Sequence, residues 1–95
     1  MMDYKKKIIL LKEDVCELFD SVSPHINASN GHEFILIVDY LDEVLTKGNI
    51  HENLTLVYVE LECLKHNCKL PEDKKKRFLA EVDALNHTIE NMLED

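Results

Sequence analysis

The chain has 95 residues, of which 45% are hydrophobic and 32% are charged, and its formal net charge is −8. A chain of this length forms one small domain with a single core, which leaves little room for a deep substrate cavity. The composition excludes a disordered chain, the absence of a long apolar run excludes a membrane span, and the negative charge disfavours a nucleic-acid-binding protein.

The first predicted helix covers residues 4–22. Its apolar residues recur at alternating steps of four and three, at Tyr4, Ile8, Leu11, Val15, Leu18 and Val22. This spacing places them on one face of a helix. Pro24 pushes the residue before it out of the helical region, so we expect the helix to end there and a loop to cover residues 24–29.

The second predicted helix covers residues 31–46 and contains the most apolar run of the chain, Phe34–Val38. Asn30 is the expected N-cap, and Glu33 stands three residues later, as in a capping box. Gly48 is the expected C-terminal stop.

Two further helices are expected at residues 50–67 and 71–93. Asn49 and Glu52 repeat the capping spacing before the third helix, and Pro71 stands in the first turn of the fourth. Each helix carries an apolar stripe. Four amphipathic helices with short connections predict an all-α single domain over residues 1–95, a four-helix antiparallel up-down bundle.

The acids are concentrated in the middle of the chain. Residues 13–62 contain eleven acids and one base, Lys47, whereas the rest contains ten bases and eight acids. Such a middle favours attraction to a basic protein. The clusters Lys5–Lys7 and Lys74–Arg77 are short and lack interleaved aromatic residues, so we expect no nucleic-acid site in them.

The cysteines and histidines form no recognisable catalytic or metal-binding signature. Cys63, His66 and Cys68 are soft ligands close in sequence, but no second Cys-x-x-Cys knuckle completes a site. We expect Cys68 in the core, Cys63 half-buried and Cys16 in or near the core. The prediction is therefore a protein without metal, cofactor or catalytic residues.

Three cysteines also fit reduced thiols, and the apolar stretch after Lys7 is too short for a signal peptide. We therefore expect a cytoplasmic protein that does not contact a membrane.

The second and third helices have more apolar residues than one buried face requires. One interpretation is that both helices are central and contact neighbours on two sides. The other is a protein-binding surface in which tyrosines stand among carboxylates, as in many interface hot spots. On the second interpretation, the predicted partner-binding residues are Leu36, Asp39, Tyr40, Asp42 and Glu43 of the second helix and Tyr58, Glu60 and Glu62 of the third.

The pattern E-F-x-x-x-x-D-Y-L-x-E-x-L, at residues 33–45, is followed by helix starts at Asn49 and Pro71. It resembles the small all-helical immunity proteins of bacterial toxin systems, such as the Maf-type and contact-dependent inhibition immunity proteins. The resemblance covers roughly residues 33–85. It implies a non-catalytic inhibitor that binds a cognate toxin, often a basic nuclease, and blocks it.

Two alternatives remain open at this point. A phage-encoded acidic inhibitor of a host nucleic-acid-binding protein would use carboxylates in place of phosphates. A homo-oligomeric helical adaptor, for example a homodimer, would bury its surplus apolar faces, at Leu36 and Val59 for instance, against another copy of the chain.

Overall fold

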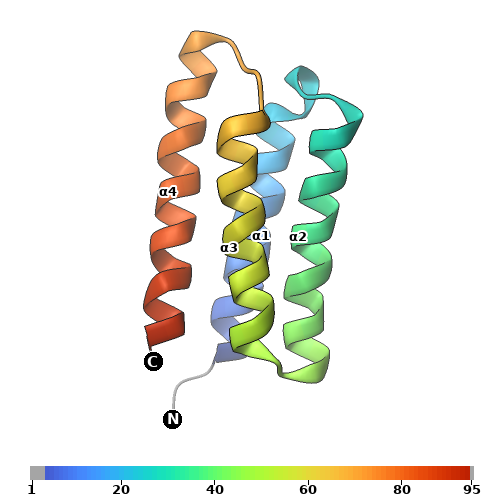
Figure 1. The fold of residues 1–95 in the computed structure, drawn as a ribbon, viewed down its shortest axis with the longest axis vertical. Helices are drawn as coiled ribbons and strands as arrows, with labels where there is room; N and C mark the ends of the chain where they lie inside the picture. The colour runs from blue at the N-terminus through green and yellow to red at the C-terminus, as the bar shows by residue number, and fades with distance from the viewer. Residues whose placement is uncertain (1–3, 95) are drawn as a thin grey trace.

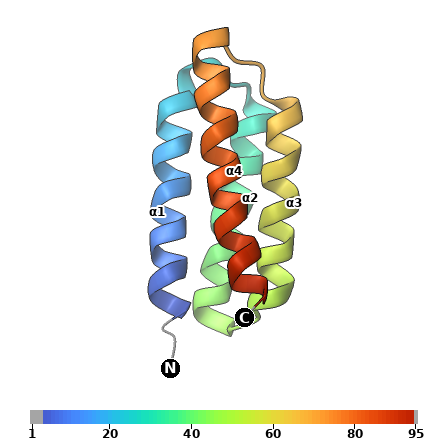
Figure 2. The same cartoon turned by 90° about the vertical axis from the view of Figure 1, so that its left-hand side faces the viewer.

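Within the described part of the chain, four helices run alternately up and down along a bundle of 42 × 22 × 18 Å (Figure 1). The computed structural model describes residues 4–94, with α1 at Tyr4–Val22, α2 at Ala28–Lys47, α3 at Ile50–Asn67 and α4 at Glu72–Glu94. Each helix packs against the next, and α4 returns to α1 (Figure 2). The prediction of an all-α antiparallel four-helix bundle is confirmed.

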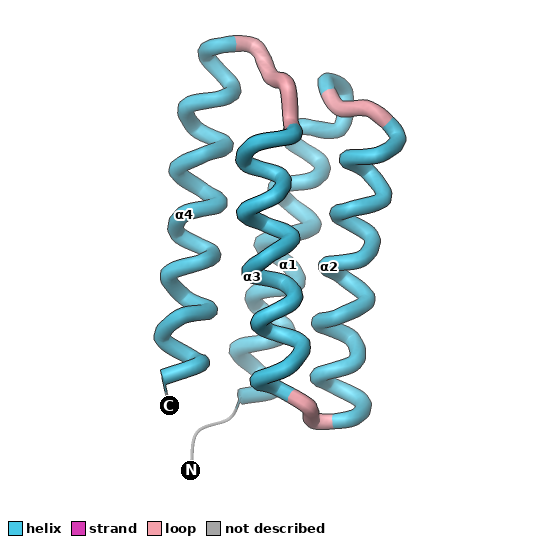
Figure 3. Tube along the Cα trace, in the orientation of Figure 1, coloured by secondary structure: helices cyan, strands magenta, loops and turns pink. Residues whose placement is uncertain are grey.

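The connections between helices are short (Figure 3). A single 3-10 turn at Ser23–His25 follows α1, where residues 24–29 were predicted to be a loop. Gly48 ends α2 in the left-handed region, with φ 76°, and its N–H donates to the Val44 carbonyl at 3.0 Å. Glycine adopts this conformation without the steric cost that a Cβ brings, so α3 can begin two residues later.

The predicted start of α2 is wrong by one turn. Asn27, not Asn30, is the N-cap, and its side-chain oxygen accepts the Asn30 backbone N–H at 2.8 Å. Asn30 lies inside the helix, where it is buried and its amide donates to Glu33 at 3.3 Å. The two asparagines stand three residues apart and can cap the same helix, but capping at Asn27 lets residues 28–30 add another turn.

The predicted capping box of α3 is also absent. Asn49 occupies the N-cap position, but its side chain makes no bond to the helix N-terminus. Its oxygen instead accepts the side-chain amide of Asn53 at 3.2 Å. At α4, Pro71 stands just outside the helix, and its carbonyl accepts the amides of Lys74 and Lys75.

The core is a continuous apolar column formed by one stripe from each helix. Its members are Ile8, Leu11, Val15, Leu18 and Val22 of α1; Phe34, Ile37, Leu41 and Val44 of α2; Leu54, Val57, Leu61 and Leu64 of α3, then Cys68; and Phe78, Val82, Leu85, Ile89 and Met92 of α4. Among the described residues, the buried polar side chains are Asn30, Asn53 and Asn86, and each donates to a glutamate carboxylate. The stripes therefore account for the burial of one face of each helix.

Candidate protein-binding surface

The predicted residues of α2 lie on different sides of that helix. Glu43 faces α3, because its Oε2 accepts from the Asn53 Nδ2 at 3.4 Å. Leu36 and Tyr40 precede Glu43 at helical spacing and share this side. Asp42 faces α1 instead, where its Oδ1 lies 2.6 Å from the Lys12 Nζ.

Asp39 is exposed on the outer ridge of α2, between these two sides. It contributes to the rim of a groove between α1 and α2, of about 230 Å³, in which Cys16, Phe19 and Ile35 also take part. The Phe19 and Phe34 rings meet edge to face across this groove, with their centroids 5.2 Å apart.

The predicted residues of α3 are likewise divided. Tyr58 and Glu62 face α4: the Tyr58 hydroxyl donates to Glu90 at 2.9 Å, and Glu62 accepts from the Asn86 amide at 2.8 Å. Glu60 lies on the opposite side of α3, toward α2. Leu56 stands one turn before Glu60 and shares that side.

One surface therefore brings together most of the predicted acids and apolar residues at the α2–α3 seam. We call it the α2/α3 surface and define it as Leu36, Asp39, Tyr40 and Glu43 of α2 with Leu56, Val59 and Glu60 of α3. Leu56 is 39% and Val59 50% exposed, whereas Tyr40 is half-buried against the core. The predicted set omitted Leu56 and Val59 and included Tyr58, because helical spacing alone does not reveal which flank of α3 is covered by α4.

The electrostatic environment differs between the acids. Within residues 4–94, neither Asp39 nor Glu60 has a cationic nitrogen within 4.0 Å, whereas Glu43 pairs with Lys47 at 3.2 Å. Together α2 and α3 carry seven acids and two bases, whereas α1 carries four of each. The fourth helix carries six acids and four bases, so the net charge is −5 for α2 and α3 together and −2 for α1 and α4 together, which makes the side of the bundle formed by α2 and α3 the more negative.

The flanks of this surface are occupied by contacts within the bundle. The hydrogen bond from Lys12 to Asp42 raises the pKa of the Lys12 ammonium, and the bonds to Asp83 and Glu62 raise the pKa of Lys65. The hydrogen bond to Glu90 raises the pKa of the Tyr58 phenol above its ordinary value. Asp42, Tyr58 and Glu62 thus already have partners in the folded chain.

The thiols are placed differently from the prediction. Cys68 is buried as expected, and burial raises its pKa to about 11, which keeps the thiol protonated and unreactive. Cys16 and Cys63, expected in or near the core and half-buried, are both exposed, because each lies just outside the apolar stripe of its helix. Cys68 lies in the core and Cys63 outside it, so the two do not converge with His66.

Among residues 4–94, no three histidine, cysteine, aspartate or glutamate side chains converge in a way that could hold a metal ion. Within the same part of the chain, no helix combines the length and the apolar character needed to cross a bilayer. No protein-family model, no curated protein and no solved structure matches the chain.

Proposed function

We propose that the chain is a non-catalytic inhibitor that binds a basic protein through the α2/α3 surface, as an immunity protein neutralises its cognate toxin. The observation that carries the proposal is that the exposed apolar residues Leu56 and Val59 lie near Asp39 and Glu60, two carboxylates with no cationic partner within residues 4–94. The apolar residues provide area that a partner can bury, and the carboxylates provide charge that attracts a basic surface.

Tyr40 is the expected hot spot of this surface. It is half-buried and held against the core, so its ring loses little conformational freedom when a partner covers it. Leu36 stands one turn away and extends the apolar centre toward Glu60. A basic nuclease toxin suits this surface, because the groups that bind its nucleic-acid substrate also attract carboxylates.

The test is binding to the toxin encoded beside this chain, measured by surface plasmon resonance at several salt concentrations. We expect the association rate to fall steeply with salt, because screening weakens attraction between exposed charges. Tyr40→Ala should weaken affinity by about 2 kcal/mol, mainly through faster dissociation.

Matched controls distinguish the effect of a charge on the α2/α3 surface from the effect of the net charge of the chain. Glu60→Gln should slow association more than Glu94→Gln, which removes one charge from an exposed position of α4. If the two changes slow association equally, the effect comes from net charge and not from the α2/α3 surface. The absence of any neighbouring toxin gene would count against an immunity protein.

A further inference from the structure

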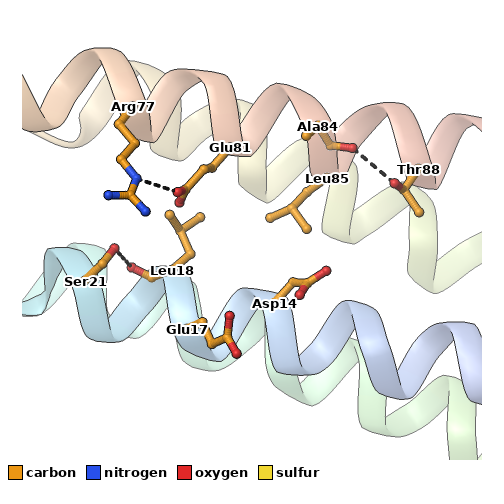
Figure 4. Close-up of a pocket in the computed structure, with 9 residues that line it drawn as sticks. All are labelled: Asp14, Glu17, Leu18, Ser21, Arg77, Glu81, Ala84, Leu85 and Thr88. Carbon is orange, nitrogen blue, oxygen red and sulfur yellow. Dashed lines mark hydrogen bonds and ion pairs between the residues drawn. The ribbon is translucent and has the colours of Figure 1, made fainter.

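A groove runs along the seam between α1 and α4, on the side of the bundle opposite the α2/α3 surface. It consists of two adjoining depressions of about 350 and 360 Å³ that share Asp14 and Thr88. Figure 4 shows the first, with Leu18 of α1 and Leu85 of α4 extending into the space between the helices. Leu85 and Met92 lie along this groove and are each 8% exposed, the highest values in the core.

The rim of the groove presents several hydrogen-bond acceptors beside two cations, Lys7 and Arg77, of which Arg77 pairs with Glu81 of its own helix at 3.0 Å. The hydroxyls of Ser21 and Thr88 donate to backbone carbonyls of their own helices, at 2.8 and 3.1 Å, so only their lone pairs remain available. Asp14 and Glu17 add carboxylates, and no cationic nitrogen of residues 4–94 lies within 4.0 Å of either. This chemistry suits an occupant that brings cations together with apolar side chains.

The N-terminal half of α1 is itself such a segment. It carries Lys5, Lys6 and Lys7 next to Ile9 and Leu10, which are 47% and 52% exposed although they belong to a bundle helix. The C-terminal half of α1 is acidic, with Glu13, Asp14, Glu17 and Asp20. Placed antiparallel to a second copy, the basic half of each α1 therefore meets the acidic half of the other.

We propose that the occupant of this groove is a second copy of the chain, with the two α1 helices antiparallel across a two-fold axis. Lys6, Leu10 and Glu17 share one face of α1 at helical spacing, and Lys6 also takes part in a contact within its own chain. Lys6 and Glu17 are separated by eleven residues, or about 16 Å, so a two-fold axis near residues 11 and 12 aligns each lysine with the other copy's glutamate. Leu10 then lies near the axis and covers the apolar floor of the groove.

Sedimentation equilibrium of the whole chain tests the proposal. We expect a reversible dimer that weakens as salt is added. Leu10→Asp should raise the dimer dissociation constant by about 10-fold to 100-fold, because it replaces a buried leucine at the interface. Ile35→Asp is the matched control: Ile35 is 58% exposed, lies on α2, and should leave the dimer unchanged.

A charge exchange gives the decisive result. Lys6→Glu and Glu17→Lys should each weaken the dimer, and the double variant should restore it, because every copy then carries both reversed charges. A wild-type chain that remains monomeric up to about 1 mM would overturn the proposal, as would a double variant weaker than either single variant. A dimer disrupted by Val59→Asp but not by Leu10→Asp would place the interface on the α2/α3 surface instead and would also overturn it.

Discussion

Replacing Asn86 by leucine is expected to stabilise the bundle, although it removes a hydrogen bond. Asn86 is 4% exposed, its Nδ2 donates to Glu62 at 2.8 Å, and its Oδ1 is buried without a donor among the described residues. A buried acceptor without a partner costs about 1–3 kcal/mol. Leucine has a similar branched shape, lacks that acceptor and is the better helix former.

Losing the hydrogen bond to Glu62 lowers the free energy of unfolding by less than removing the unsatisfied acceptor raises it. The side chain of Glu62 is 39% exposed and keeps Lys65 at 3.2 Å, so losing the amide costs only about 0.5–1.5 kcal/mol. The net expectation is a gain of about 1 kcal/mol in the free energy of unfolding. In urea this raises the midpoint by roughly 0.5–1 M at an unchanged slope.

Asn53 provides the matched control, because it is also buried but its amide has two partners, Glu43 at 3.4 Å and Asn49 at 3.2 Å. Asn53→Leu should lower the free energy of unfolding by about 1–2 kcal/mol, since it abolishes both bonds. Urea titrations of the two variants followed by circular dichroism measure the difference. If Asn86→Leu destabilises the chain as much as Asn53→Leu does, the Asn86 oxygen is not stranded and the reasoning is refuted.

Three further predictions concern thiols, a phenol and a turn. In the folded chain at pH 8, alkylation read by mass spectrometry should modify Cys16 and Cys63 and spare Cys68, whose pKa of about 11 and burial protect it; equal labelling of all three would contradict this. In an alkaline absorbance titration, Tyr58 should ionise above the ordinary phenol pKa of 10, and Tyr58→Phe should remove that phase. Because the pKa is raised in the folded state, the stability that the Tyr58 hydrogen bond contributes is present below pH 10 and is lost as the pH rises through the raised pKa. Gly48→Ala should lower the free energy of unfolding by about 1 kcal/mol in a thermal melt, because φ is 76° and an added Cβ meets only ordinary contact; an unchanged melting temperature would show that the turn adjusts.

The helices could be predicted from the sequence because their apolar stripes repeat with the helical period without interruption. The structure has α1 and α3 at the expected ranges, and those stripes supply the core. The start of α2 could not be chosen with the same rule. Asn27 and Asn30 are both competent caps, and the choice between them depends on whether residues 28–30 gain more by joining the helix than by remaining a loop.

The candidate surface was harder to predict than the fold. A helical wheel shows which residues avoid the core, but the position of the neighbouring helices decides which of those residues remain accessible. Asp42 and Tyr58 both fit the pattern of an acidic-aromatic surface. In the fold, however, Asp42 pairs with Lys12 of α1, and the Tyr58 hydroxyl donates to Glu90 of α4. Leu56 remains exposed because α4 packs on the other flank of α3, and Val59 remains exposed because it stands on the side of α3 opposite the buried Val57 and Leu61.

The distribution of ion pairs is consistent with the proposal that the acids of α2 and α3 attract a partner. Among the described residues, ion pairs between helices join α1 to α2, through Lys12 and Asp42, and α3 to α4, through Lys65 and Asp83. None of the ion pairs of residues 4–94 crosses the seam between α2 and α3, although these two helices carry seven acids and two bases. Like charges on adjacent helices oppose their packing, and among the described residues Glu43 is the one of these acids that hydrogen-bonds across the seam, where it accepts from the Asn53 amide. Recruitment of a basic partner, the role proposed for the α2/α3 surface, would account for the concentration of acids on these two helices.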